Sequence, residues 1–261
     1  MNAELIEQLA EEIYVCLTAG KTLLPLSERV PDITIDDAYQ ISLTLLQKRL
    51  SDGEKLVGKK IGLTSKVVQD MLGVHQPDFG FLTDRMQYIS GAEIQLQTTL
   101  IQPKAEGEIA FVLKEDLIGP GISPEDVLAA TEGVAPCFEI VDSRVQDWKI
   151  QIQDTVADNA SCGLFVLGDK LIDPTKIDFE NCRMQLFNRD KLVAEGLGSA
   201  ALGSPLNCVA WLANALGKYG VSLNKGDVIL SGSLAAMLPV QEGDQFSMSI
   251  EGIGSCSISF I

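Results

Sequence analysis

The amino-acid sequence predicts an α+β fold in which a mixed β-sheet core follows an N-terminal helical cap. Helical periodicity is concentrated in the first third of the 261 residues, and short β-branched and aromatic runs dominate from about residue 94 onward. Glycine and proline turns recur without a low-complexity linker or an internal repeat. We therefore expect one domain over residues 1–261, mainly helical over 1–75 and β-rich over 76–261.

The helical cap is predicted from two amphipathic segments. Residues 3–18 carry apolar side chains on one face, and residues 39–50 carry them at helical spacing. The turn-forming run Ser51-Asp52-Gly53 ends the second segment. We expect a short helix over 65–72 and a turn-like loop over 75–80, which contains a proline and a glycine.

The β-rich part is divided into short runs that are bounded by turn residues. The expected strands span 108–113, 134–141, 163–167, 183–187, 191–195, 227–231, 245–250 and 255–260. Asn188-Arg189-Asp190 supplies the turn of a hairpin between two of them. Two helices interrupt the strands and begin at Ser123-Pro124 and Ser204-Pro205, where a serine precedes a proline at the first helical position.

The net charge and the N-terminal residues disfavour several classes of protein. The chain carries 36 acidic and 20 basic residues, and the net charge of −16 opposes binding to nucleic acid and anionic membranes. No apolar run approaches the ~20 residues that span a bilayer, and the acidic start lacks the basic and apolar blocks of a secretion signal. We therefore expect a cytoplasmic protein. Because the net charge also repels organic acids, a site for such a ligand needs a local positive charge, which a bound metal and a lysine would supply.

Residue content excludes several common catalytic and metal-binding arrangements. The six cysteines are scattered without a Cys-x-x-Cys pair, and we expect them to be small buried hydrophobes. His75 is the single histidine, which excludes a three-histidine zinc centre and leaves one candidate for a serine or cysteine relay. The sequence contains no nucleophile-elbow, phosphate-loop or zinc-helix motif.

The most informative motif is Glu106-Gly107-Glu108, at the start of an apolar run. Side chains two residues apart on a strand point to the same face, about 6.6 Å apart along the backbone. Two buried like charges repel unless a cation or a proton lies between them. A divalent metal is the simplest resolution.

Glu139 is a third carboxylate of interest because it lies in the otherwise apolar run 134–141. If this strand neighbours 108–113, Glu139 converges with Glu106 and Glu108. Three carboxylates without a nitrogen or thiolate cluster favour Mg²⁺ or Mn²⁺ over zinc or copper. The alternative is that these glutamates are solvated positions on a half-exposed sheet.

Other polar residues could take part in chemistry, and each has a plainer interpretation. Lys60, flanked by glycines and apolar residues, could neutralise a metal-bound acid or exchange protons, or it could be an exposed turn lysine. Asp78 could be a general acid or base, or an Asx-turn residue, and His75 has the same ambiguity. Ser161 could donate a hydrogen bond to a substrate carboxylate or water, or lie in a polar loop.

Four segments, 57–64, 73–80, 103–108 and 154–161, together resemble a known family. They read VGKKIGLT, GVHQPDFG, PKAEGE and DTVADNAS, and they are similar to the 2-hydroxypenta-2,4-dienoate (2-oxopent-4-enoate) hydratases of the fumarylacetoacetate hydrolase superfamily. The resemblance runs nearly end to end, through 226–232 and the C-terminal strand. Several motifs in one order make it far more specific than any single Glu-x-Glu.

This resemblance implies a mixed-sheet or β-roll core, a single catalytic domain and a bacterial role in meta-cleavage breakdown of aromatic compounds. It implies Mg²⁺ or Mn²⁺ as the cofactor and a homo-oligomer as the assembly, and a complex with a neighbouring enzyme of the pathway is a further expectation. The site residues that it implies are Glu106, Glu108 and Glu139 for the metal, and Lys60, Asp78 and Ser161 for catalysis.

The implied reaction is hydration. We expect the 2-oxo (or enol) oxygen and the C1 carboxylate of the substrate to chelate the metal, which stabilises enolate charge. Ketonisation leaves a double bond conjugated to the 2-oxo group, and water adds at C4 to give 4-hydroxy-2-oxopentanoate. Asp78 is the expected proton-transfer residue, and Lys60 is expected to orient the substrate carboxylate.

Three alternatives stay open. A 4-oxalocrotonate decarboxylase would use the same metal and enol chemistry with loss of CO₂, although the block from His75 to Asp84 and the stretch around Asp147-Trp148 favour hydration. A 2-oxohept-4-ene-1,7-dioate hydratase would need an extra basic group in the pocket, and we locate none in the sequence. A non-catalytic subunit that stabilises a partner enzyme is disfavoured, because a scaffold gains little from three costly carboxylates.

Overall fold

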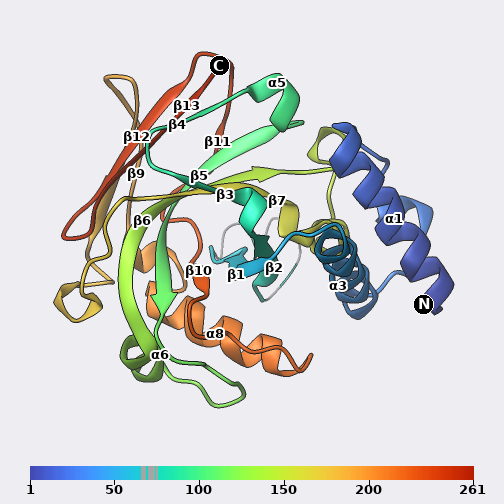
Figure 1. The fold of residues 1–261 in the computed structure, drawn as a ribbon, viewed down its shortest axis with the longest axis horizontal. Coiled ribbons are helices and arrows are strands. Elements are labelled where there is room, and N and C mark those ends of the chain that lie inside the picture. Colours follow the sequence, from blue (N-terminus) through green and yellow to red (C-terminus); the bar gives the residue numbers. More distant parts are fainter. Residues whose placement is uncertain (66–68, 70–73, 75) are drawn as a thin grey trace.

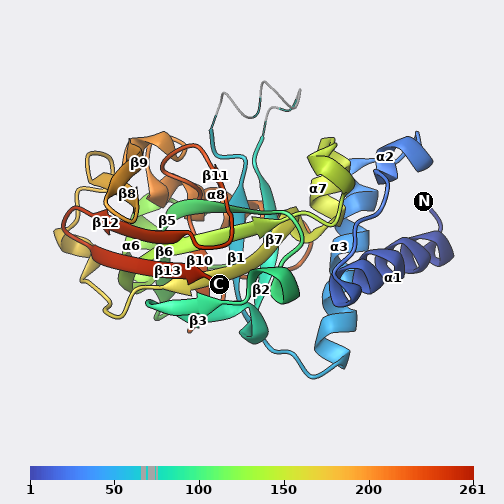
Figure 2. The same ribbon diagram turned by 90° about the horizontal axis from the view of Figure 1, so that it is seen from above.

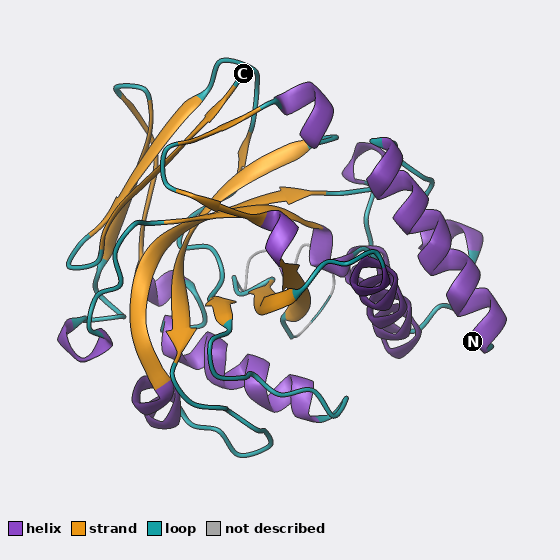
Figure 3. Ribbon diagram, viewed as in Figure 1, coloured by secondary structure: helices purple, strands orange, loops and turns teal. Residues whose placement is uncertain are grey.

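The computed structural model describes residues 1–65, 69, 74 and 76–261. The short helix expected over 65–72 and His75 fall mostly outside these residues. Figure 1 shows the N-terminal helices on one side of the molecule and the β-sheets on the other, and Figure 2 shows the same separation from above. The secondary structure is therefore divided as the α+β prediction requires (Figure 3).

The N-terminal cap contains helices α1 (Ala3–Ala19), α2 (Leu26–Arg29) and α3 (Ile35–Ser51). The side chain of Asn2 accepts a hydrogen bond from the first turn of α1, and Thr34 forms a capping box with Asp37 at the start of α3. The apolar faces of α1 and α3 pack together. Tyr39 of α3 stacks on Phe79 of the core sheet with ring centroids 4.1 Å apart, which fixes the cap against the sheet.

Among the described residues, eight strands form the larger sheet, in the order β2-β1-β10-β5-β6-β7-β3, with β11 also paired to β5. These strands are β1 (Leu56–Gly62), β2 (Asp78–Thr83), β3 (Gln87–Ile89), β5 (Pro103–Leu113), β6 (Thr131–Asp142), β7 (Cys162–Leu167), β10 (Val228–Leu230) and β11 (Leu238–Pro239). The pairs β1–β10 and β3–β7 are parallel and the remaining pairs are antiparallel, so the sheet is mixed.

The smaller sheet has the strand order β4-β13-β12-β8-β9. Its strands are β4 (Ala92–Ile94), β8 (Arg183–Asn188), β9 (Lys191–Leu197), β12 (Gln245–Ile250) and β13 (Gly254–Phe260). Alternate residues of β12 are buried. One of them, Phe246, packs near Phe138 of β6, with the centroids of the two rings 6.4 Å apart. The core between the two sheets is built from such side chains.

The remaining helices connect the strands. They are α5 (Leu96–Thr99), α6 (Pro124–Ala130), α7 (Ile152–Ala157) and α8 (Pro205–Gly217), with short 3₁₀ turns at Asp84–Met86, Gln146–Trp148, Asn159–Ser161, Pro174–Lys176 and Gly198–Ala200. Ser123 caps α6 and Pro205 opens α8, as predicted. None of the helices among the described residues combines the length and apolar character needed to cross a bilayer.

The eight predicted strands are confirmed, with small differences in their bounds, and Asn188 pairs with Lys191 across the predicted hairpin turn. Two interpretations were wrong. β1 lies within the segment expected to be mainly helical, and β2 begins at Asp78, inside the expected loop. Every residue of β2 is buried, and four successive residues of β1 are buried. Neither strand therefore has the alternation of buried and exposed residues that marks a half-exposed strand. The single catalytic domain stays a prediction.

Candidate metal centre and substrate pocket

Three glutamates converge on the larger sheet. The antiparallel register of β5 and β6 places Glu106 directly opposite Glu139, and Glu108 lies two residues further along the same face of β5. One carboxylate oxygen from each residue lies within 4.8 Å of the other two. The predicted convergence is therefore confirmed.

The donor set fits a hard divalent cation. Glu108 and Glu139 are buried, and Glu106 is partly exposed. One oxygen of Glu108 accepts a hydrogen bond from the backbone N–H of Gly232 at 2.8 Å, but its other oxygen and both oxygens of Glu139 accept none. Lys60 forms an ion pair with Oε1 of Glu139, but one lysine does not compensate three carboxylates. Buried carboxylate oxygens without hydrogen bonds are costly, and a cation bound between them removes that cost.

The pKa values of Glu106 and Glu108 reflect their burial and the repulsion between the carboxylates. Burial, followed by the charge of Glu139, raises the pKa of Glu106 to about 7. Burial and the charges of Glu139 and Glu106 also hold the pKa of Glu108 well above its ordinary value. Three ionised carboxylates are therefore unfavourable here without a compensating positive charge.

Lys60 and Asp78 approach this cluster from the neighbouring strands. Lys59 and Lys60 point to opposite faces of β1, so Lys59 pairs with Asp227 while the Nζ of Lys60 lies 3.1 Å from Oε1 of Glu139. The Lys60 side chain is only 3% exposed, which rules out the interpretation as an exposed turn lysine. Burial lowers the pKa of Lys60, but the charges of Glu139 and Asp78 oppose it and the pKa is raised overall.

Asp78 is buried at the start of β2, opposite Gly62 of β1. Burial raises the pKa of Asp78 to about 6, although Lys60 opposes this shift. Its Oδ1 has no hydrogen-bond partner among the described residues. A Cβ atom added at Gly62 would overlap Oδ1 of Asp78, so a glycine is required for the carboxylate to occupy this position.

Ser161 lies at the end of a turn whose residues have left-handed backbone conformations. Asn159, Ala160 and Ser161 all have left-handed backbone conformations, with φ of 55°, 49° and 53°. The guanidinium of Arg144 donates to the carbonyl of Asp158 at 2.7 Å and to that of Cys162 at 3.1 Å, on either side of the turn. This arrangement holds the strained backbone in place.

Further contacts fix the same turn. The Nε of Arg144 lies 2.5 Å from Oδ1 of the buried Asp158. The side chain of Asn159 exchanges two hydrogen bonds with the backbone of Phe81 on β2, at 2.8 and 2.9 Å. The Ser161 hydroxyl lies 3.2 Å from that of Thr155. The sequence pattern did not identify Arg144 or Asn159, because nothing in it marks a left-handed run without glycine.

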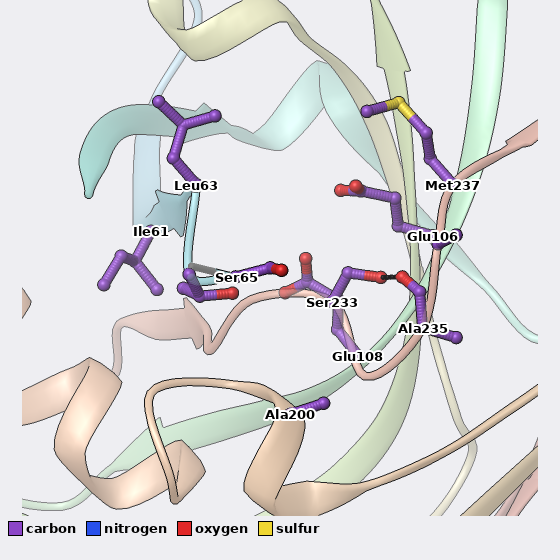
Figure 4. Close-up of a pocket in the computed structure, with 12 residues that line it drawn as sticks. Ile61, Leu63, Ser65, Glu106, Glu108, Ala200, Ser233, Ala235 and Met237 are labelled. Atoms are coloured by element: carbon purple, nitrogen blue, oxygen red, sulfur yellow. Dashed lines mark hydrogen bonds between the residues drawn. The ribbon is translucent and has the colours of Figure 1, made fainter. Parts of the chain in front are cut away.

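Two cavities meet at Glu106. A cavity of about 320 Å³ is lined by all three predicted catalytic residues, together with Glu106, Lys104 and Trp148. A second cavity of about 380 Å³ is lined by Glu106, Glu108 and neighbouring small residues. Figure 4 shows the carboxylates of Glu106 and Glu108 directed into the second cavity.

The predicted site residues are thus brought together, with one addition. Lys104 is a basic residue in the first cavity, and its Nζ lies 4.2 Å from the centroid of the Trp148 ring. Lys104 is therefore a basic group of the kind that the sequence interpretation did not locate. The signal was present in the spacing, because Lys104 precedes Glu106 by two residues and shares its strand face.

This chain is similar to proteins that are named as hydratases. A 2-hydroxyhexa-2,4-dienoate hydratase of Comamonas testosteroni is 57% identical over 260 residues, which cover 99% of this chain and 98% of that protein. A 2-hydroxypent-2,4-dienoate hydratase of Pseudomonas putida is 59% identical over 222 residues, which cover 85% of this chain and 100% of that protein.

The fold is similar to that of a solved 4-oxalocrotonate decarboxylase from Pseudomonas putida G7, complexed with magnesium and adipate. The TM-score is 0.97 at 34% identity, with 100% of this chain and 99% of that chain covered. A family model described as fumarylacetoacetate (FAA) hydrolase C-terminal matches residues 59–260. The chain belongs to the fumarylacetoacetate hydrolase family.

Proposed function

We propose that this protein is a metal-dependent hydratase that adds water to 2-hydroxypenta-2,4-dienoate, in equilibrium with 2-oxopent-4-enoate, to give 4-hydroxy-2-oxopentanoate. The observation that carries this proposal is the convergence of three carboxylates beside a cavity that also contains Lys60, Asp78 and Ser161. The names of the two hydratases described above support it. The reaction belongs to the meta-cleavage breakdown of aromatic compounds.

The metal would be Mg²⁺ or Mn²⁺, held by Glu106, Glu108 and Glu139. The magnesium in the solved decarboxylase supports this choice, as does the all-oxygen donor set. When bound, such a cation supplies Lewis acidity toward the 2-oxo oxygen of the substrate.

The side chains of this protein then handle protons and orientation. Asp78, with a pKa of about 6, can accept and return a proton near neutral pH as the dienol becomes a 2-oxo compound with a conjugated double bond. Lys60 keeps a positive charge between Glu139 and Asp78. Ser161 donates a hydrogen bond to the substrate or to the water that adds at C4.

A second candidate function is decarboxylation of 4-oxalocrotonate, because the solved decarboxylase matches the fold over the whole chain. Lys104 in the cavity also allows a second carboxylate on the substrate, which the longer 2-oxohept-4-ene-1,7-dioate carries as well. The higher identity to hydratases favours hydration over both. The homo-oligomer, the complex with a pathway enzyme and the cytoplasmic location remain predictions.

The deciding experiment is an assay of the purified protein with 2-hydroxypenta-2,4-dienoate and, separately, with 4-oxalocrotonate, each with and without EDTA. We expect EDTA-sensitive loss of the dienol absorbance, without CO₂, and formation of 4-hydroxy-2-oxopentanoate. Release of CO₂ from 4-oxalocrotonate as the faster reaction would establish the decarboxylase instead. Inactivity toward both substrates would support the non-catalytic role.

A further inference from the structure

One face of β5 carries a row of functional side chains. Lys104 and Glu106 are two residues apart and point to the same side of the strand, toward the first cavity. Their separation along the backbone is about 6.6 Å. The ammonium group of Lys104 and the carboxylate cluster are therefore close enough for one small organic acid to contact both.

Trp148 forms a fixed support for this ammonium group. The Nζ of Lys104 lies over the indole ring, 4.2 Å from its centroid. The indole Nε1 donates to the carbonyl of Gln102 at 2.9 Å, and the Gln102 side chain donates to the carbonyls of Ser143 and Val145. The ring is thus hydrogen-bonded to Gln102, which immediately precedes β5. Among the described residues, Lys104 is held by a cation–π contact and not by an ion pair with a carboxylate.

The two lysines of the cavity have different charge environments. Lys60 is almost fully buried, lies 3.1 Å from Glu139 and is also near Asp78, so its charge is already compensated. Lys104 has no carboxylate within 4.0 Å in the part of the chain that the structure describes, although the protein carries a net charge of −16. A cation that faces a cavity without an acidic partner is free to bind an anion.

We infer that Lys104, supported by Trp148, is the residue that binds the carboxylate of the substrate, and that Lys60 does not fill this role. The inference rests on the proposed function, because it takes the substrate to be a small 2-oxo acid. The carboxylate end of the substrate lies between Lys104 and the glutamate cluster. Its carbon chain extends toward Asp78 and Ser161, where protons are exchanged.

The test measures binding rather than turnover. The metal-loaded protein is titrated with 2-oxopentanoate, a saturated analogue that cannot be hydrated, and with the neutral 2-oxopentanamide. Binding is followed by the fluorescence of Trp148 in a Trp211→Phe background, since these are the two tryptophans of the chain. Saturation with Mn²⁺ is verified by electron paramagnetic resonance, so that lost ligand binding is not mistaken for lost metal.

We expect Lys104→Met to weaken 2-oxopentanoate binding by about 10- to 100-fold and to change 2-oxopentanamide binding by less than about 2-fold. Lys104→Arg keeps most of the affinity for the acid. Lys149→Met is the matched control, because Lys149 is a neighbouring lysine that is exposed and paired with Asp147. It should leave both affinities unchanged.

The inference is overturned if Lys104→Met leaves the affinity for 2-oxopentanoate unchanged, or weakens the acid and the amide equally. An equal effect would mean that Lys104 only shapes the cavity. Because no turnover is measured, the outcome is separate from that of the hydratase assay: a protein inactive toward the dienoate can still show carboxylate binding at Lys104, and an active hydratase can fail this test.

Discussion

Glu106 on β5 lies directly opposite Glu139 on β6, in register across an antiparallel strand pair. Like charges at opposed positions of two strands destabilise a sheet, and burial increases the cost. Glu139 is fully buried and its oxygens accept no hydrogen bonds among the described residues. An arrangement that is unfavourable for folding alone is favourable for holding a divalent cation, which supports the proposed metal site.

Metal affinity should rise with pH. In the metal-free protein, burial followed by the charge of Glu139 raises the pKa of Glu106 to about 7, and the same causes hold the pKa of Glu108 well above its ordinary value. Protons therefore compete with the metal below about pH 7, and binding releases them. Calorimetric titration with Mn²⁺ between pH 6 and 8, in two buffers of different ionisation enthalpy, should show increasing affinity and release of at least one proton. Affinity that is constant or falls with pH would contradict this.

Asp78→Asn should remove proton transfer without disturbing the fold. The variant keeps the shape of the side chain but cannot exchange a proton, so we expect kcat to fall by about 10²- to 10⁴-fold with a small change in KM. Steady-state kinetics with the dienoate measure this effect. Asp84→Asn, an exposed position just after β2, is the control and should retain the wild-type kcat. A normal kcat in Asp78→Asn would remove Asp78 from the mechanism.

Gly62→Ala should displace the Asp78 carboxylate, because the added Cβ would overlap Oδ1. Because a small displacement of a catalytic group disrupts its alignment with the substrate, we expect kcat to fall by about 10- to 100-fold. The control is Val57→Ala, which alters the same strand away from the cavity. Kinetics of both variants, with thermal unfolding to verify folding, check the prediction. Equal activity of Gly62→Ala and wild type would show that the position of Asp78 is not critical.

Arg144→Met should strongly destabilise the protein. It leaves the Asp158 carboxylate buried without its partner and removes the contacts that hold the left-handed turn before Ser161. The free energy of unfolding should fall by about 3–5 kcal/mol. The double variant Arg144→Met/Asp158→Asn should lose less than the sum of the single variants, because the unpaired charge is then absent. Denaturant unfolding measures all three, and strict additivity would rule out the pairing.

Much of the core could be predicted from the sequence because its signals are local. The eight predicted strands are short apolar runs between turns, and the observed pairing of β5 with β6 places Glu139 opposite Glu106. Spacing of two residues predicts a shared strand face regardless of the rest of the fold. The spacing of Glu106 and Glu108 predicts their shared face, whereas the convergence of Glu139 with them depended on the pairing of the two strands.

The rest depends on contacts between distant segments. β1 contains two adjacent lysines that suggest a turn, yet each is buried against a carboxylate from elsewhere in the chain, Lys59 at Asp227 and Lys60 at Glu139. The contact of Lys104 with the Trp148 ring likewise joins two segments that are far apart in the sequence. Such pairings have no sequence period, so pattern alone could not distinguish them from solvent-exposed charges.

The central claim is that Glu106, Glu108 and Glu139 hold one divalent cation, and the most direct measurement is Mn²⁺ binding followed by electron paramagnetic resonance at pH 7.5. We expect one Mn²⁺ per wild-type chain, and a large loss of affinity together with loss of metal-dependent turnover in Glu106→Gln, with an unchanged circular dichroism spectrum. Glu93→Gln, an exposed glutamate on β4, should bind Mn²⁺ like the wild type. A wild-type protein without a stoichiometric site, or a fully active Glu106→Gln variant, would contradict the claim.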